Sequence, residues 1–227
     1  MEAGVLLTIH GRPFGGTLAL RAVIFDYGMV LTGQPDKEAH DAMVRLTGLS
    51  TERFESFYWA DRLAYDAGTL NSTTFWQSFL RDAGLEVSAD KVEELHRLDA
   101  CMWTTTDPDM LAWQLQLKQH GIRTAILSNM GDGIHQSMER KFDWLPRFDV
   151  LVWSYQLGMI KPKPEIYLHT LERLGTRPDE TLFLDDRLEN VEAARALGLV
   201  ALQFSTVPQL RADLIAAGLD SQLPVPA

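Results

Sequence analysis

Side chains that could do chemistry follow four short apolar runs of this sequence. The runs and the groups after them are Ala22 to Phe25 with Asp26, Ala125 to Leu127 with Ser128 and Asn129, Val150 to Trp153 with Lys161 further on, and Leu182 to Leu184 with Asp185 and Asp186. One acidic residue after an apolar run is weak evidence, because loops are commonly polar. Four such loops that converge would bring carboxylates, a hydroxyl or amide donor and a lysine into one site. That set suits a phosphate dianion and Mg²⁺, which prefers oxygen ligands.

The apolar runs are typical of buried parallel strands, and Leu199 to Phe204 is a fifth candidate. Helices are expected after the N-cap residue Asp107, from Pro164 to Leu174 and from Asn190 to Leu197. This alternation predicts a doubly wound α/β core with a parallel sheet. Ligands of such sheets gather at the carboxyl ends of the strands, where the strand order reverses. The polar groups are therefore expected to meet there.

Residues of about 36 to 104 interrupt the alternation. They predict helices punctuated by glycines, with Asn71 and Ser88 as N-caps. A block of about 70 residues between two strands is too long for a crossover helix, so an inserted helical cap is expected there. The core would comprise residues of about 21 to 35 and 105 to 227. Residues 1 to 20 contain several turn formers and predict a flexible leader.

Composition limits the partners and the compartment. The formal net charge of -10 disfavours binding to nucleic acid or to an anionic membrane, because both are anionic themselves. No stretch approaches the length of a membrane-spanning helix, and the N-terminus lacks the basic region of a signal peptide. The single cysteine, Cys101, cannot form an internal disulfide. A cytoplasmic protein is the prediction, and the sequence predicts no oligomeric state.

Four segments in order resemble the motifs of the haloacid dehalogenase-like hydrolase superfamily. They are AVIFDYGMVLT, AILSNM, GMIKPKPEIY and LFLDDRLENVEAARALG, and the resemblance covers Arg21 to about Phe204. The place of the helical insertion resembles the subfamily with an α-helical cap after the first strand. The resemblance implies a Rossmann-like core and a Mg²⁺-dependent hydrolase of a small phosphorylated metabolite, with a sugar phosphate as one candidate.

The resemblance also implies roles for individual residues. Asp26 would be the nucleophile and would form an aspartyl-phosphate intermediate. Ser128, helped by Asn129, would donate a hydrogen bond to the transferring phosphoryl group. Lys161 would hold that group against Asp26 and offset its charge.

The metal ligands implied by the resemblance are Asp185, Asp186, one oxygen of Asp26 and the backbone carbonyl of Gly28. Asn190, on the helix after the acidic pair, would order the metal loop. The cofactor expected in this site is therefore Mg²⁺.

Cap residues are expected to choose the substrate. Tyr65 lies three positions after Arg62, so the two can share a helix face, and both are predicted substrate contacts. Trp59 and Asp66 are further candidates, whereas Trp103 is expected to fill apolar space.

Gly28 departs from the phosphatases of this superfamily, which usually carry a second Asp there as general acid and base. Loss of such a group typically costs about 10²- to 10⁴-fold in rate. One alternative is a 2-haloacid dehalogenase, although those relatives work without a metal and lack the acidic pair. Another is a noncatalytic binding module. A third is a phosphatase with a restricted substrate, because Asp-x-Gly-x-Val resembles α-glucose-1-phosphate phosphatases and the phosphatase-like domains related to epoxide hydrolases.

Overall fold

Five parallel strands form the centre of the protein, seen in a computed structural model that describes residues 19–227. The strands are β1 (Ala22–Phe25), β2 (Arg123–Ser128), β3 (Val150–Trp153), β4 (Thr181–Asp185) and β5 (Val200–Gln203). Their order in the sheet is β3-β2-β1-β4-β5, and every neighbouring pair is parallel. All five predicted strands are confirmed. The strand order reverses beside β1, because β2 and β4 flank it on opposite sides.

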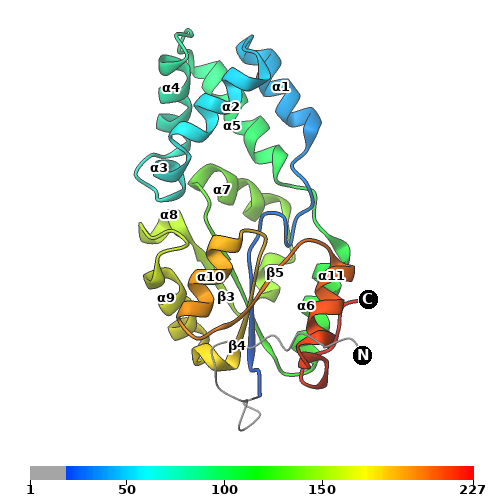
Figure 1. The fold of residues 1–227 in the computed structure, drawn as a ribbon. Coiled ribbons are helices and arrows are strands. Elements are labelled where there is room, and N and C mark those ends of the chain that lie inside the picture. The colour runs from blue at the N-terminus through cyan, green and yellow to red at the C-terminus, as the bar shows by residue number, and fades with distance from the viewer. Residues whose placement is uncertain (1–18) are drawn as a thin grey trace, which may run out of the picture.

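The sheet is covered by helices on both faces (Figure 1). The core helices are α6 (Pro108–Gln119), α7 (Asp132–Lys141), α8 (Ser154–Leu157), α9 (Pro164–Leu174), α10 (Leu188–Ala196) and α11 (Val207–Ala216). In β1, Val23 and Phe25 pack into the apolar cluster with α6, α7 and α11, whereas Ala22 and Ile24 pack against α9 and α10. Because both faces are buried, the strand is apolar throughout rather than alternating.

The helices begin where their capping residues predict. The Asp107 side chain accepts hydrogen bonds from the amides of Asp109 and Met110 and so caps α6. Helix α9 ends at Gly175, whose φ of 63° is the left-handed conformation that glycine adopts without strain. Helix α10 begins at Leu188, slightly earlier than the predicted start at Asn190.

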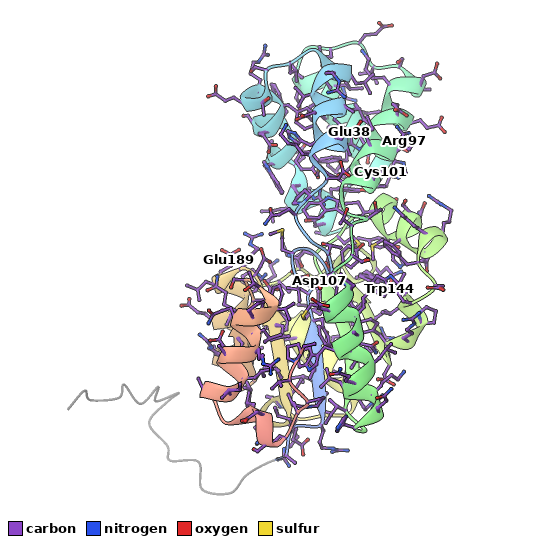
Figure 2. The ribbon with its side chains drawn as sticks, turned by 90° about the vertical axis from the view of Figure 1, so that its right-hand side faces the viewer. Glu38, Arg97, Cys101, Asp107, Trp144 and Glu189 are labelled. Atoms are coloured by element: carbon purple, nitrogen blue, oxygen red, sulfur yellow. The ribbon has the colours of Figure 1, made fainter. Side chains whose placement is uncertain are left out.

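The helical insertion lies between β1 and α6 and forms a second lobe above the sheet (Figures 1 and 2). Its helices are α1 (Lys37–Thr47), α2 (Thr51–Ala60), α3 (Arg62–Asp66), α4 (Ser72–Asp82) and α5 (Ala89–Met102). Asn71 and Ser88 cap α4 and α5 with their side chains, as predicted. The lobe has an aromatic-rich apolar cluster of its own, which includes Phe54, Phe75 and Trp76.

The chain joins the core just before β1. Leu20 is buried, and its amide donates to Gln222 Oε1 at 2.8 Å. Residues 1–18, which make up most of the predicted leader, lie outside the described range. None of the helices within the described range has the length and apolar character that a membrane crossing requires.

The insertion docks onto the segments that follow β2 and β3. The amide of Gly133 donates to the Tyr65 hydroxyl at 3.2 Å, and Ser154 Oγ donates to the carbonyl of Asp66 at 2.5 Å. Gly131 lies directly against the Tyr65 ring: a Cβ added at Gly131 would be 2.1 Å from Tyr65 Cζ. The absence of a side chain at Gly131 therefore permits this close approach of the two lobes.

We predict that Gly131→Ala lowers the free energy of unfolding by about 1–3 kcal/mol, because the added methyl group overpacks the contact with Tyr65. The φ of -80° at Gly131 suits any residue, so the effect would be steric and not conformational. Gly33→Ala is the matched control, since nothing lies within 4 Å of its added Cβ. Urea denaturation measures both variants. Equal stability of Gly131→Ala and wild type would show that the lobes do not pack this closely in solution.

Candidate active site

Asp26 lies at the carboxyl end of the central strand. Its amide donates to the carbonyl of Leu184 at 2.9 Å, which continues the pairing of β1 with β4. The amide of Tyr27 donates to Asp26 Oδ1 at 2.7 Å, and the amide of Met29 donates to Thr32 Oγ1 at 3.1 Å. Met29 has a φ of 61°, which is uncommon for a residue with a side chain and occurs often at functional sites. Local hydrogen bonds thus hold a tight turn directly after the carboxylate.

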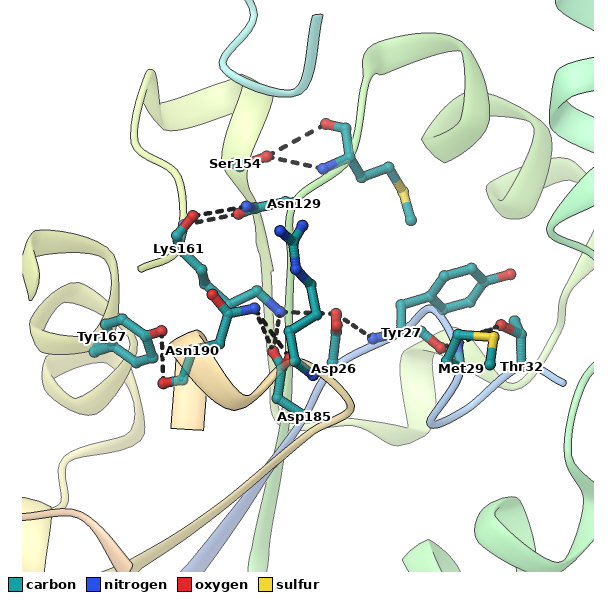
Figure 3. Close-up of polar contacts among 12 residues, drawn as sticks. Asp26, Tyr27, Met29, Thr32, Asn129, Ser154, Lys161, Tyr167, Asp185 and Asn190 are labelled. Atoms are coloured by element: carbon teal, nitrogen blue, oxygen red, sulfur yellow. Dashed lines mark hydrogen bonds and ion pairs between the residues drawn. The ribbon is translucent and has the colours of Figure 1, made fainter. Parts of the chain in front are cut away.

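Lys161 lies between two carboxylates (Figure 3). Its Nζ is 2.9 Å from Asp26 Oδ1 and 2.6 Å from Asp185 Oδ2, and the residue is only 2% exposed. The backbone of Lys161 is fixed by Asn129: the Lys161 amide donates to Asn129 Oδ1 at 2.8 Å, and Asn129 Nδ2 donates to the Lys161 carbonyl at 2.9 Å. Both polar atoms of the Asn129 side chain are therefore used. Asn129 lines the cavity and also positions Lys161, and its predicted contact with substrate stays a prediction.

The acidic pair is ordered by its own helix. Asp185 Oδ1 accepts hydrogen bonds from the Arg187 amide at 2.9 Å and from Asn190 Nδ2 at 3.0 Å. The carbonyl of Asn190 in turn accepts from the Tyr167 hydroxyl at 3.1 Å. Asn190 thus holds Asp185 in one orientation, which is the geometry expected of a residue that orders the metal loop.

Three carboxylates converge on one point. Asp26, Asp185 and Asp186 each offer an oxygen, and these oxygens all lie within 4.8 Å of one another. Gly28 lines the same cavity. Clustered carboxylate oxygens are the donors that Mg²⁺ prefers, and the residues present therefore fit this ion.

The protonation of these groups reflects their burial. Burial, together with the negative charges of Asp185 and Asp186, raises the pKa of Asp26 to about 7, although Lys161 opposes the shift. Burial and the neighbouring Asp185 likewise raise the pKa of Asp186. Burial alone would lower the pKa of Lys161, but the Asp185 and Asp26 carboxylates raise it instead. Lys161 is therefore a permanent cation in a site with excess negative charge.

Ser128 ends β2 and lines the cavity beside Asp26. Its side chain is nearly buried, and within residues 19–227 its hydroxyl makes no hydrogen bond to another protein group. A hydroxyl in this position is available to an oxygen of a bound ligand.

Above the carboxylates, a cavity of about 200 Å³ lies between the core and the insertion. Arg62 lines it, but its guanidinium is engaged: Nε is 3.0 Å from Asp66 Oδ1 and Nη1 is 3.7 Å from Asp99 Oδ1. Nη1 also donates to the hydroxyl of Tyr58. Tyr65, which we expected to contact substrate, is fully buried and is not part of the cavity wall.

Within residues 19–227, six further wall residues were not predicted from the sequence as part of the site: Tyr27, Met29, Trp103, Met130, Ile134 and Arg187. Four of them adjoin predicted site residues in the sequence, so extending each predicted loop by one residue would have found them. Trp103, expected only to fill apolar space, lies where the insertion returns to the core. A Cβ added at Gly28 would be 3.6 Å from its ring atom Cζ3.

We predict that Lys161→Met lowers the free energy of unfolding in chelator by about 3–5 kcal/mol, because it leaves buried carboxylates without their counter-charge. The same change should tighten Mg²⁺ binding, since a competing cation is removed from two ligand carboxylates. Denaturation with and without Mg²⁺ and calorimetric titration measure the two effects. The exposed neighbour Lys163→Met is the control. Weaker Mg²⁺ binding in Lys161→Met would contradict this assignment of ligands.

A second prediction concerns the stability of the metal-free protein. In the folded protein Asp26 is buried beside Lys161, Asp185 and Asp186. Its pKa there rises from 3.8 to about 7. Below pH 4 the carboxyl is neutral whether folded or unfolded. Between pH 4 and 7 folding must take up a proton, so the wild type loses stability as pH rises, and above pH 7 the cost is constant.

Asp26→Asn escapes this cost because its amide stays neutral. In chelator at pH 8 it should be more stable than wild type by on the order of 1–3 kcal/mol, and the difference should vanish near pH 4. Urea denaturation across this pH range measures it. A variant less stable than wild type at pH 8 would show that the ionised carboxylate is favoured in the fold.

Comparison with known proteins agrees with this geometry. A model of the haloacid dehalogenase-like hydrolase family matches residues 20–198. The chain is 30% identical over 188 residues to sesquiterpene phosphatase astK of Aspergillus oryzae, covering 82% of this chain and 90% of that protein. It is 27% identical over 201 residues to (S)-2-haloacid dehalogenase 1 of a Pseudomonas species, covering 83% and 86%.

A crystal structure of a haloacid dehalogenase family enzyme from Bacteroides thetaiotaomicron, in complex with magnesium and inorganic phosphate, has the same fold. Its TM-score is 0.69 at 22% sequence identity, over 81% of this chain and 93% of that one. The family match, the long alignment with the fungal relative and the shared fold lead to one conclusion. The chain belongs to the haloacid dehalogenase-like hydrolases.

Proposed function

We propose that the protein is a Mg²⁺-dependent phosphomonoesterase that uses Asp26 as a covalent nucleophile. The observation that carries this proposal is the convergence of Asp26, Asp185 and Asp186 around one point, with Lys161 paired to the first two. The name of the relative from Aspergillus oryzae supports a phosphate ester as substrate. The magnesium and phosphate bound to the Bacteroides enzyme support the cofactor.

Each residue of the site would have a separate role in phosphoryl transfer. Asp26 Oδ1 is held by Tyr27 and Lys161, and within residues 19–227 no hydrogen bond to Oδ2 is found, so Oδ2 is free to attack phosphorus. The Ser128 hydroxyl would donate to an oxygen of the transferring group. Lys161 would stabilise the negative charge of that group, and Asn129 and Asn190 would keep Lys161 and Asp185 in place.

Electrostatics explains why both cations are needed. Two unit charges about 4 Å apart interact by roughly 4 kcal/mol at an effective dielectric constant near 20. A phosphate dianion facing three carboxylates and one lysine would therefore be strongly repelled. Mg²⁺, held by Asp26, Asp185, Asp186 and the Gly28 carbonyl, would neutralise the excess negative charge and polarise the phosphate.

Another reaction of this family is hydrolysis of haloacids, as the name of the Pseudomonas relative shows. Such a substrate carries a carboxylate and needs a cation to bind it, but Arg62 already faces Asp66 and Asp99. The clustered carboxylates of Asp26, Asp185 and Asp186 suit a metal ion and a phosphate. The geometry therefore favours the phosphatase over the dehalogenase.

The first test measures hydrolysis of p-nitrophenyl phosphate with Mg²⁺. We expect chelator and Asp26→Asn each to reduce the rate to background, because one removes the metal and the other cannot form an acyl phosphate. Asp41→Asn, which changes a surface carboxylate of α1, should retain activity. Hydrolysis of 2-chloropropionate in chelator would favour the dehalogenase. No turnover of any phosphate ester would favour a noncatalytic module.

The second test concerns the missing acid at Gly28. Wild-type kcat/KM should depend steeply on the pKa of the leaving group, since no carboxylate at position 28 can protonate it. An added Cβ contacts Trp103 at an ordinary 3.6 Å, so Gly28→Asp should fold. It should accelerate poor leaving groups by up to about 10²-fold and flatten the dependence.

Gly28→Asn is the matched control, because its side chain has the same size and cannot exchange a proton in this way. If Gly28→Asp and Gly28→Asn give the same leaving-group dependence, the new carboxylate does not act as an acid. If wild type already hydrolyses alkyl and aryl phosphates equally fast with chemistry rate-limiting, another residue supplies the proton.

A further inference from the structure

We infer that the cavity above Asp26 binds an apolar leaving group, so that the substrates are phosphomonoesters of aliphatic or aromatic alcohols rather than sugar phosphates. This inference rests on the proposed function and specifies the substrate class of the same site. It follows from the composition of the cavity wall, from the use of its polar groups and from the pairing of its cations.

The wall beyond the carboxylates is mainly apolar. Trp59 and Trp103 contribute indole rings, and Met29, Met130 and Ile134 contribute aliphatic side chains. Met130 and Ile134 are almost fully buried beneath this surface. The five apolar wall residues come from both lobes. Trp59 belongs to the insertion, Trp103 lies where the insertion returns to the core, and the other three belong to the core. An apolar group placed here would be removed from water on several sides.

Away from the phosphoryl position, several polar groups of the wall already bind protein partners. Both polar atoms of Asn129 bind the Lys161 backbone, and Asn190 Nδ2 binds Asp185. Arg62 binds Asp66 and Tyr58. The hydroxyls of a sugar would lose their hydrogen bonds to water here and find few replacements, which is costly for each buried polar group. The site therefore disfavours a polyhydroxylated leaving group.

The cations of the wall are also paired, which disfavours a second anionic group on the substrate. Arg62 faces the carboxylates of Asp66 and Asp99 at 3.0 and 3.7 Å. Arg187, at the rim, pairs with Glu189 at 2.5 Å. Lys161 is used at the phosphoryl position. One phosphate with an uncharged organic body matches this arrangement.

One apolar wall residue reaches from the cavity to the solvent. Trp59 lines the cavity and is itself 53% exposed. A leaving group longer than the cavity would thus meet the Trp59 ring at its mouth.

The test is calorimetric binding of n-alkylphosphonates, from ethyl to octyl, to the full chain loaded with Mg²⁺. Their carbon–phosphorus bond is not hydrolysed, and their charge stays constant while the apolar chain lengthens. We expect Kd to fall by about two- to fourfold per methylene until the cavity is filled, which corresponds to the usual transfer free energy of a buried CH₂. A Kd independent of chain length would overturn the inference.

Variants at Trp59 connect the effect to this cavity. Trp59→Gln removes apolar surface from an exposed position and should reduce the ratio of ethyl to octyl Kd values by roughly fivefold. Trp59→Phe should retain most of the ratio. Leu168→Ala, on exposed α9 surface outside the cavity, is the control and should match wild type. A ratio in Trp59→Gln equal to wild type would place the alkyl chain elsewhere and overturn the assignment.

Rates of hydrolysis distinguish a failure of this inference from a failure of the proposed function. Hexyl phosphate and glucose 6-phosphate both have a primary alcohol as leaving group, so the chemistry is similar and the contacts differ. We expect a higher kcat/KM for hexyl phosphate. A preference for glucose 6-phosphate would overturn the apolar assignment while leaving the phosphatase intact. Chain-length-dependent phosphonate binding without hydrolysis of any ester would overturn the phosphatase and leave the apolar site.

Discussion

The structure depends on one buried arrangement of charge, in which Lys161 lies between Asp26 and Asp185 at the carboxyl edge of the sheet. Buried ions are costly unless they are paired and hydrogen-bonded. Each partner here is accordingly held by a neighbour: Asn129 fixes the Lys161 backbone, and Asn190 fixes the Asp185 carboxylate. One lysine cannot neutralise three carboxylates, so the site retains excess negative charge. This excess is what makes it suitable for a divalent cation.

The helical insertion completes the site that the sheet begins. It adds Trp59 and Arg62 to the cavity wall. It docks through Tyr65 onto the segment after β2 and through Asp66 onto the segment after β3. The close contact of Tyr65 with Gly131 means that a change in the position of the insertion would also disturb the loop that carries Ser128 and Asn129. The position of the insertion and the order of this loop are therefore physically connected.

Gly28 lies next to the apolar part of the cavity wall. The ring of Trp103 lies next to the space that a side chain at Gly28 would enter. A carboxylate there would be placed against an indole and partly desolvated, which is unfavourable for its ionised form. A leaving group that contacts this apolar wall gains binding free energy from its organic body, and part of that binding can offset the absence of a general acid.

The sequence by itself determined the sheet and the chemical centre. Continuous apolar runs specify buried parallel strands, and the polar residues that end such strands must share one edge of the sheet. Asp26, Lys161 and Asp185 could therefore be predicted from the sequence to lie close together. Local caps such as Asp107 and Asn71 fixed where helices begin, because capping depends only on neighbouring residues. Only the tertiary structure decided which polar groups remain free. Among residues 19–227, the Asn129 side chain is hydrogen-bonded to Lys161 and the Ser128 hydroxyl has no protein partner, because hydrogen-bond partners come from segments far apart in the chain.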